Sequence, residues 1–432
     1  MGEYKGKSSL WNNKKIISWS LYDWANSAFA TTVMAGFFPV FFKKYWSVGT
    51  EVTASTFKLG LANSSASILI ALFAPFLGAI ADKANAKKKF LFFFAFLGVV
   101  MTGSLYLVGQ GEWKMAVMLY ILASIGFASG NIFYDALLVD VAQKSKFDMV
   151  SALGFSLGYL GGGLLLALNV FMTLSPQTFG LKSSVEAVRL SFITVALWWA
   201  VFSIPLFVYV KERKLTEDET AENVIFSGFK QLVSTLKKFK ETKVAFIFLL
   251  SYWFYIDGVD TIIRMAVDYG MSIGFDEKNL ILALLLVQFV GFPAALVFGK
   301  IGEKFGAKKG IYLAIAVYIV ISFWGFFMDS IWEFYGLAVS IGLVQGGIQA
   351  LSRSFYTSLI PKDKAAEFLG FYNMFGKFAV IFGPFLMGTI AVLTGNPRYS
   401  VFAVTFLLVV GAVILTRVPD SNLSQKKSLM PN

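Results

Sequence analysis

The segment Gly78-Ala79-Ile80-Ala81-Asp82-Lys83-Ala84-Asn85-Ala86-Lys87-Lys88 occurs twice in this chain. Its second copy is Gly299-Lys300-Ile301-Gly302-Glu303-Lys304-Phe305-Gly306-Ala307-Lys308-Lys309. In both copies a glycine is followed, at identical spacing, by an acidic residue, a lysine, a turn residue and a pair of lysines. The turn position holds Asn85 or Gly306, and these residue types most readily adopt a left-handed backbone. The repeat indicates that the chain contains two copies of one structural unit.

Both copies of the segment lie between long apolar runs. Hydrophobic residues make up 57% of the 432 residues, charged residues only 15%, and the mean hydropathy is +0.67. A water-soluble protein carries about 25% charged residues, so this chain has too little polar surface to cover a soluble body. The runs are about 20 residues long, which is the length of a helix that crosses a bilayer. Such a segment must be helical, because its backbone groups need internal partners.

We therefore predict an all-α membrane protein with twelve transmembrane helices in two six-helix bundles. The first bundle covers 1–210, a cytoplasmic linker covers 211–243, and the second bundle covers 244–432. The predicted spans lie near 16–42, 57–81, 89–109, 114–140, 149–174, 187–210, 244–270, 279–301, 309–328, 332–359, 366–394 and 399–417. A lysine-rich piece of the linker, 226–240, has helical apolar spacing, and we expect it at the membrane interface.

The lysines and arginines determine the predicted orientation. The net charge is +12, but the basic residues cluster in short segments between apolar runs and not on one face of a domain, which argues against a nucleic-acid partner. Most of them lie on the side that carries both termini, the linker and both copies of the repeated segment. Because basic segments stay in the cytoplasm, we predict an inner (plasma) membrane protein with both termini cytoplasmic. We expect a monomer in the lipid bilayer.

Cysteine and histidine are both absent from the chain. Their absence excludes disulfides, Cys-His metal sites and haem attachment, and it leaves proton chemistry to carboxylates. The sequence also has no Gly-x-x-x-x-Gly-Lys-Ser/Thr loop to hold a phosphate, which argues against an ATP-driven pump. We therefore expect no cofactor, no metal and no enzymatic activity.

Several motifs resemble those of known transporters. The segment from Gly78 to Lys88, with its second copy, resembles the cytoplasmic-turn signature of the major facilitator superfamily, although Asn85 replaces the usual glycine and Glu303 the usual aspartate. Three further motifs resemble the autophagy-related vacuolar amino-acid effluxers and their bacterial relatives: Tyr22-Asp23-Trp24-Ala25-Asn26-Ser27-Ala28-Phe29, Gly158-Tyr159-Leu160-Gly161-Gly162 and Asp257-Gly258-Val259-Asp260-Thr261-Ile262. The resemblance covers essentially the whole chain and implies transport, with amino-acid efflux as the role of the fungal branch.

Charged and amide side chains inside the predicted spans form the candidate site, because such groups are costly in a membrane. The resemblance implies that spans one, four, seven and ten line the central cavity, and nearly all the deep polar residues fall on them. The candidate substrate and proton pathway consists of Asp23, Asn26, Asn131, Asp135, Asp257, Asp260, Arg264, Gln345, Gln349 and Arg353. Lys377 in span eleven is the exception, with either a functional role or a snorkelling side chain.

Span seven carries the densest polar set. At about 100° per residue, Asp257, Asp260, Arg264 and Asp268 fall on one helix face. They form either an acidic stripe facing the cavity, with Arg264 as its counter-ion, or a structural salt bridge. Asp257 has no basic residue one turn away on its own helix, and neither has Asp23, so we predict these two as the first proton carriers. For Asp23 the alternative is a role in helix packing.

Two further groups are predicted to control access from the cytoplasm. Asp135 and Arg353 lie at similar depth near the cytoplasmic ends of spans four and ten, where they either form a gate or anchor a substrate carboxylate. Snorkelling is the alternative for Arg353. The gating turns are predicted to form salt-bridge clusters, with topology-setting charge as the alternative; they comprise Gly78, Asp82, Lys83, Lys87, Gly299, Glu303, Lys304 and Lys308.

These observations together predict a secondary active transporter that works by alternating access. The predicted substrate is a small polar solute, the family resemblance suggests an amino acid, and we expect its transport to be coupled to protons. An exporter of drugs, peptides or other small metabolites is the main alternative, and a membrane-embedded enzyme or a receptor is the next. Glycines from Gly154 to Gly163 allow close helix approach, but Tyr159 stands where antiporters of the superfamily have proline.

Overall fold

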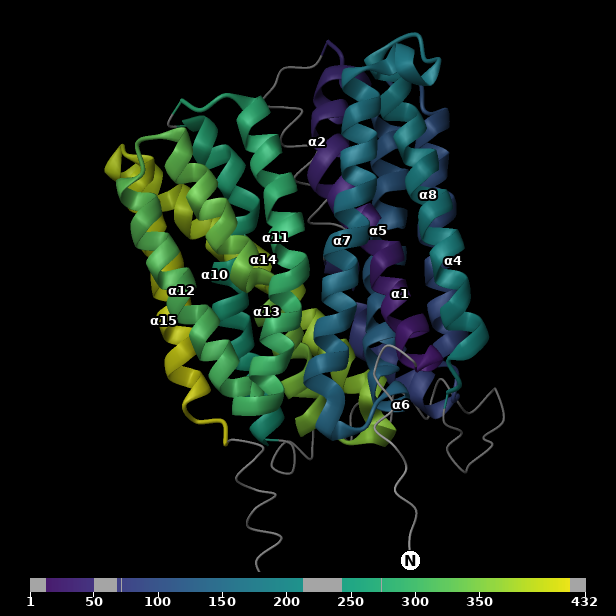
Figure 1. Cartoon of the computed structure of the whole chain (residues 1–432), viewed down its shortest axis with the longest axis vertical. Helices are drawn as coiled ribbons and strands as arrows, with labels where there is room; N and C mark the ends of the chain where they lie inside the picture. Colours follow the sequence, from purple (N-terminus) through teal and green to yellow (C-terminus); the bar gives the residue numbers. More distant parts are fainter. Residues whose placement is uncertain (1–12, 50–67, 71, 213–242, 273, 420–432) are drawn as a thin grey trace, which may run out of the picture.

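The structure is a computed structural model, and it describes residues 13–49, 68–70, 72–212, 243–272 and 274–419. Its helices form two bundles that stand side by side (Figure 1). The first bundle contains the residues before the linker, and the second contains those after it. The described helices follow the order that the apolar runs predict.

The first bundle opens with one long helical segment, Lys14–Trp46. It consists of α1 (Lys14–Ala28), a π-helical part, η2 (Phe29–Phe37), the short α2 (Phe38–Phe41) and η3 (Phe42–Trp46). Residues 72–83 are helical as well. The remaining helices of this bundle are α4 (Lys87–Ser104), α5 (Trp113–Ala136), the short α6 (Leu138–Val141), α7 (Phe147–Leu174) and α8 (Ser184–Tyr209).

The described residues of the second bundle form six long helices. They are α10 (Lys243–Ser272), α11 (Glu277–Phe305), α12 (Ala307–Phe327), α13 (Ile331–Leu359), α14 (Ala365–Thr394) and α15 (Val401–Leu415). The start of α13 shows why a helix begins where it does. Ser330 accepts a hydrogen bond from the Glu333 backbone N–H, and the Glu333 carboxylate accepts one from the Ser330 N–H, which together form a capping box.

The membrane-spanning helices match the prediction from hydropathy. Within the described residues, ten helices are long and apolar enough to cross a membrane. A further helix, α14, occupies the span predicted at 366–394. The span predicted at 57–81 and the amphipathic piece at 226–240 lie largely or wholly outside the described residues. The all-α, two-bundle membrane fold is confirmed.

The two repeated turns have the backbone that the sequence predicts. Asn85 has φ 47°, and it is the one non-glycine residue with positive φ in the described part of the chain. Gly306 has φ 95°. Each turn reverses the chain between two helices, so both copies of the repeat connect a span to its neighbour at the same end of the molecule.

The bundles meet along α7, which packs against α11 and α13, while α5 packs against α14. We call one end of the molecule the basic end: there α1 begins at Lys14, α4 begins at Lys87 and α12 begins at Ala307 (the lower end in Figure 1). Glycines allow the helices to approach closely. A Cβ on Gly161 of α7 would lie 2.7 Å from the Trp24 carbonyl oxygen of α1, so only glycine fits there.

Candidate functional site

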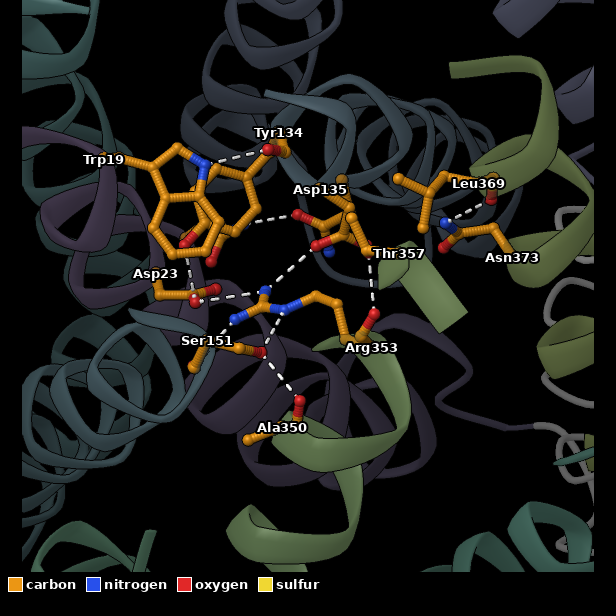
Figure 2. Close-up of polar contacts among 12 residues, drawn as sticks. Trp19, Asp23, Tyr134, Asp135, Ser151, Ala350, Arg353, Thr357, Leu369 and Asn373 are labelled. Atoms are coloured by element: carbon orange, nitrogen blue, oxygen red, sulfur yellow. Dashed lines mark hydrogen bonds and ion pairs between the residues drawn. The ribbon is translucent and has the colours of Figure 1, made fainter. Parts of the chain in front are cut away.

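Arg353 joins the two bundles through a buried cluster of charges near the basic end. It belongs to α13 of the second bundle and is 2% exposed. Its Nη1 lies 2.9 Å from Asp135 Oδ1 of α5 and 3.5 Å from Asp23 Oδ2 of α1 (Figure 2). Asp135 is 7% and Asp23 is 8% exposed. One guanidinium from the second bundle therefore pairs with two carboxylates of the first.

The rest of the guanidinium is also held by the first bundle. Nε of Arg353 donates to Ser151 Oγ at 2.8 Å, and Nη2 donates to the Ser151 carbonyl at 2.9 Å. Ser151 in turn donates to the Ala350 carbonyl of α13 at 2.8 Å. The guanidinium carbon lies 4.3 Å from the centre of the Phe155 ring and 5.0 Å from that of Trp19. Hydrogen bonds in the plane and aromatic rings on the faces are the contacts a guanidinium favours.

Asp23 is oriented by aromatic neighbours. Tyr134 donates its hydroxyl to Asp23 Oδ2 at 2.7 Å, and Trp19 donates to the Tyr134 carbonyl at 2.9 Å while the two rings stack at 4.4 Å. Gly154 makes room for the carboxylate, since a Cβ there would lie 2.5 Å from Asp23 Oδ2. The cluster is thus built by α1, α5 and α7 around a side chain that α13 supplies.

The charges in this cluster do not balance. Two carboxylates and one guanidinium carry a net charge of −1 when all are ionised, and one added proton makes the cluster neutral. Such an imbalance is expensive in a site screened from water. The snorkelling alternative for Arg353 is wrong, because the side chain is buried between the bundles. The counter-ion that Asp23 lacks on its own helix comes from α13.

Amide side chains lie further from the basic end. Asn26 of α1 donates to Asn131 Oδ1 of α5 at 2.6 Å. Tyr159 of α7 donates to Gln349 Oε1 of α13 at 3.4 Å. The buried Gln345 Oε1 has no hydrogen-bond donor among the described residues. The sequence-predicted amides thus form one pair within the first bundle and one contact between the bundles, and the Gln345 oxygen keeps an acceptor open.

The acidic residues of α10 have different surroundings. Asp257 is 2% exposed and accepts a hydrogen bond from the Gly383 backbone N–H of α14 at 2.9 Å and one from Thr261 Oγ1 at 3.4 Å. Asp260 is half-buried. The side chains of Arg264 and Asp268 lie outside the described set, so the pairing of Arg264 with Asp260 stays a prediction. Lys377 is half-buried on α14.

The first repeated turn contacts the second bundle through a buried carboxylate. Asp82 is 2% exposed and accepts hydrogen bonds from the backbone N–H groups of Ala366 (3.2 Å) and Glu367 (2.8 Å) in the first turn of α14. Lys87 lies 3.6 Å from Asp82 and 3.4 Å from Asp140. A Cβ on Gly78 would lie 2.2 Å from the Ala366 carbonyl oxygen. A carboxylate at a helix N-terminus is a favourable arrangement.

The second repeated turn also reaches the other bundle, but at the surface. Glu303 accepts from Lys146 Nζ at 2.9 Å. Lys308 donates to the Val418 carbonyl, and Lys304 lies 5.1 Å from the centre of the Phe305 ring, so both contact their own bundle. The two turns and the Arg353 cluster together connect the two bundles at the basic end, and we call this arrangement closed.

Reasoning from the sequence missed several residues of this site. Ser151, Tyr134 and Phe155 are neutral, and two of them lie on α7, which is outside the four spans that the resemblance marks as cavity-lining. Glu212, at the start of the linker, accepts from the backbone N–H groups of Lys87 (2.9 Å) and Lys88 (3.3 Å) and caps α4. Its position directly after a span was the one available signal.

The comparisons with known proteins and the fold show a membrane transporter of the major facilitator superfamily. The structure resembles that of the proton:xylose symporter XylE, with a TM-score of 0.70 at 13% identity over 94% of this chain and 95% of the other. The chain matches the family described as "Vacuole effluxer Atg22 like" over residues 12–427. It belongs to this family, and family and fold are those of transporters and not of enzymes.

Two curated relatives extend the match. The uncharacterized MFS-type transporter YxiO of Bacillus subtilis (strain 168) is 39% identical over 423 residues, which covers 97% of this chain and 98% of the relative. Autophagy-related protein 22 of Yarrowia lipolytica is 25% identical over 66% of this chain. The matched region is 53% of the Yarrowia protein, so the likeness to that relative covers about half of its length.

Proposed function

We propose that this chain moves amino acids across the plasma membrane, coupled to protons, by alternating access, with both termini in the cytoplasm. The observation that carries the proposal is the Arg353 cluster, in which one bundle inserts a buried cation between two carboxylates of the other. Such a contact exists only while the bundles are closed at the basic end. Opening that end separates Arg353 from Asp23 and Asp135.

The charge imbalance of the cluster supports proton coupling. While all three groups are ionised, the guanidinium is the only described positive charge that compensates the two carboxylates within the cluster. A proton on either carboxylate weakens its attraction for Arg353 and lowers the barrier to opening. Asp257 is the second candidate, because it is buried and has no ion pair among the described residues.

The amide groups and the family support an amino-acid substrate. Asn26, Asn131, Gln345 and Gln349 offer both donors and acceptors, and the acidic Asp260 of α10 is half-buried. A zwitterion needs both kinds of partner. The family description, a vacuole effluxer, agrees with transport of a small solute out of a compartment. The bacterial relative supports placement in the plasma membrane.

Purified protein in proteoliposomes tests the proposal. Uptake of a panel of labelled amino acids is measured with and without a pH gradient, and we expect saturable flux that the gradient increases. Asp23→Asn and Arg353→Ala should each lower coupled flux by about 100-fold or more, because they remove the charges that the gate needs. Asp329→Asn is the matched control, since that carboxylate is exposed and pairs with Arg398 outside the interface.

Two results would overturn the proposal. The first is an absence of saturable flux for every amino acid in the panel. The second is proton-dependent flux that Asp23→Asn and Asp257→Asn together leave unchanged. Saturable flux of a drug, a peptide or another metabolite, with none of an amino acid, would support the alternative exporter.

A further inference from the structure

Tyr159 of α7 inserts its ring between two helices of the second bundle. A Cβ on Gly291 of α11 would lie 2.9 Å from Tyr159 Cδ1, and a Cβ on Gly346 of α13 would lie 2.8 Å from Tyr159 Cε2. Real side chains do not approach so closely. We call Gly291 and Gly346 the glycine slot. The ring fits into it because both positions lack a side chain, and Tyr159 is 8% exposed as a result.

The slot lies deeper than the charged contacts. At about 1.5 Å per residue, Tyr159 is about 18 Å from the basic end of α7, and the two slot glycines are about 20 Å from the basic ends of their helices. Arg353 is only about 9 Å from the end of α13 by the same measure. Tyr159 therefore forms a separate layer of contact between the bundles, near the middle of the membrane.

Packing, and not hydrogen bonding, holds Tyr159 in place. Its hydroxyl donates to Gln349 Oε1 at 3.4 Å, which is long for an O–H donor. One turn earlier on the same helix, Ser156 donates to the Phe292 carbonyl of α11 at 2.8 Å, so the helix backbones are already close on this side. A ring enclosed by two helix backbones gains many small contacts that disappear together when the helices separate.

We propose that Tyr159 and the glycine slot form a second lock between the bundles. The ring occupies the slot when the basic end is closed and must leave it when the bundles rock apart, so Tyr159 is a positioning residue of the transport cycle. This rests on alternating access as proposed above. The lock is independent of the charged cluster, because it uses an aromatic ring against backbone and no ion pair.

A single cysteine reports whether the basic end is open. The chain has no cysteine of its own. Ser354 is fully buried and donates to Asp148 Oδ1 of the other bundle at 2.6 Å, so Ser354→Cys places a thiol in the closed interface. Its rate of labelling by a water-soluble maleimide, in purified protein without substrate, measures opening.

Three variants in this background test the lock. Gly346→Ala fills the slot, and we expect labelling about tenfold faster, because overpacking favours the state in which the ring has left. Tyr159→Phe keeps the ring, and we expect labelling within about twofold of the parent, because the long hydroxyl contact contributes little. Tyr159→Ala empties the slot, so Gly346→Ala added to the Tyr159→Ala variant should not increase the labelling rate further.

Gly347→Ala is the matched control. A Cβ there would lie 2.1 Å from Cγ of Phe298, which belongs to α11 of the same bundle. This variant strains the second bundle internally, so it should lower the melting temperature without accelerating labelling. Equal acceleration by Gly347→Ala would overturn the proposal, and so would an undiminished effect of Gly346→Ala in the Tyr159→Ala background. The assay needs no substrate, so its outcome is separate from that of the uptake experiment.

Discussion

The two copies of the repeated turn are alike in sequence, yet they contribute to the closed interface in different ways. Asp82 is 2% exposed and binds the backbone N–H groups that begin α14. The side chain of Glu303 is 26% exposed and pairs with Lys146, whose side chain is 51% exposed. Both carboxylates cross between the bundles, but only the first does so away from water.

The lysines of the two turns differ in the same way. Lys87 is 5% exposed and contacts both Asp82 and Asp140. Its counterpart Lys308 donates to the backbone carbonyl of Val418, which follows α15 in its own bundle. A repeated motif therefore conserves where a charge is placed, whereas the surrounding packing decides how much that charge contributes. Exposed pairs contribute little, and breaking a buried pair is costly.

Replacing the carboxylate of each turn by alanine should give the largest difference in stability between the two turns. Asp82→Ala leaves Lys87 buried with one partner and leaves two helix N–H groups uncapped, so we expect a loss of about 3 kcal/mol in the free energy of unfolding. Glu303→Ala should change it by about 0.5 kcal/mol or less, since exposed ion pairs are worth little. Unfolding of the purified variants in detergent measures both.

The partner variant Asp82→Asn provides the control for this comparison. The amide keeps an acceptor for one of the N–H groups of α14 but has no charge for Lys87, so its loss should be intermediate. Equal losses for Asp82→Ala and Glu303→Ala would show that burial does not distinguish the two turns.

Alanine substitutions at the first glycine of each turn, Gly78 and Gly299, should give a smaller difference in the stability of the closed state. A Cβ on Gly78 would lie 2.2 Å from the Ala366 carbonyl oxygen, so Gly78→Ala forces the backbone of α14 away. A Cβ on Gly299 would lie 2.6 Å from the Ala152 Cβ, a side chain that can be removed. We expect Gly78→Ala to destabilise the closed state by about 2 kcal/mol, within the usual range of overpacking.

A rescue experiment makes the glycine comparison specific. Ala152→Gly should restore the labelling rate of the Ser354→Cys reporter in the Gly299→Ala variant, and it should not do so in Gly78→Ala. Failure of the rescue would contradict the contact between Gly299 and Ala152 as the source of the effect.

Much of the fold could be predicted from the sequence. The apolar runs give the spans, because helix is the structure that satisfies a backbone in hydrocarbon. The repeat predicts that the chain consists of two similar halves, and its turn residues Asn85 and Gly306 both have positive φ, as expected. The contacts between the halves are different, because hydropathy reports the medium around a helix and not its neighbours.

The candidate site could be predicted only in part. Depth along a helix places Arg353 level with Asp135, since the rise per residue is constant. No single-helix argument could show that Asp23 shares the same guanidinium, or that Ser151 of α7 binds its Nε. Asp257 illustrates the same limit. Its face on α10 is predictable, but its partner, the Gly383 N–H of α14, depends on how two helices pack.

The pH dependence of closure should also distinguish the buried Asp82 from the exposed Glu303. Burial raises the pKa of Asp82 to about 7, although Lys87 and the N–H groups of α14 oppose the increase. When the basic end opens and water reaches this turn, the pKa should return towards about 4. The closed state then binds a proton that the open state releases, so closure weakens as the pH rises from about 4 to 7, by up to about 1.4 kcal/mol per pH unit, and changes little above that range. Labelling of Ser354→Cys from pH 5 to 8, normalised to denatured protein at each pH, measures the slope. Asp82→Asn should flatten this slope, whereas Glu303→Gln should leave it unchanged. A slope of the same sign that persists in Asp82→Asn would overturn the assignment to Asp82, because protonation of the carboxylates around Arg353 is proposed to weaken closure and would give the opposite sign.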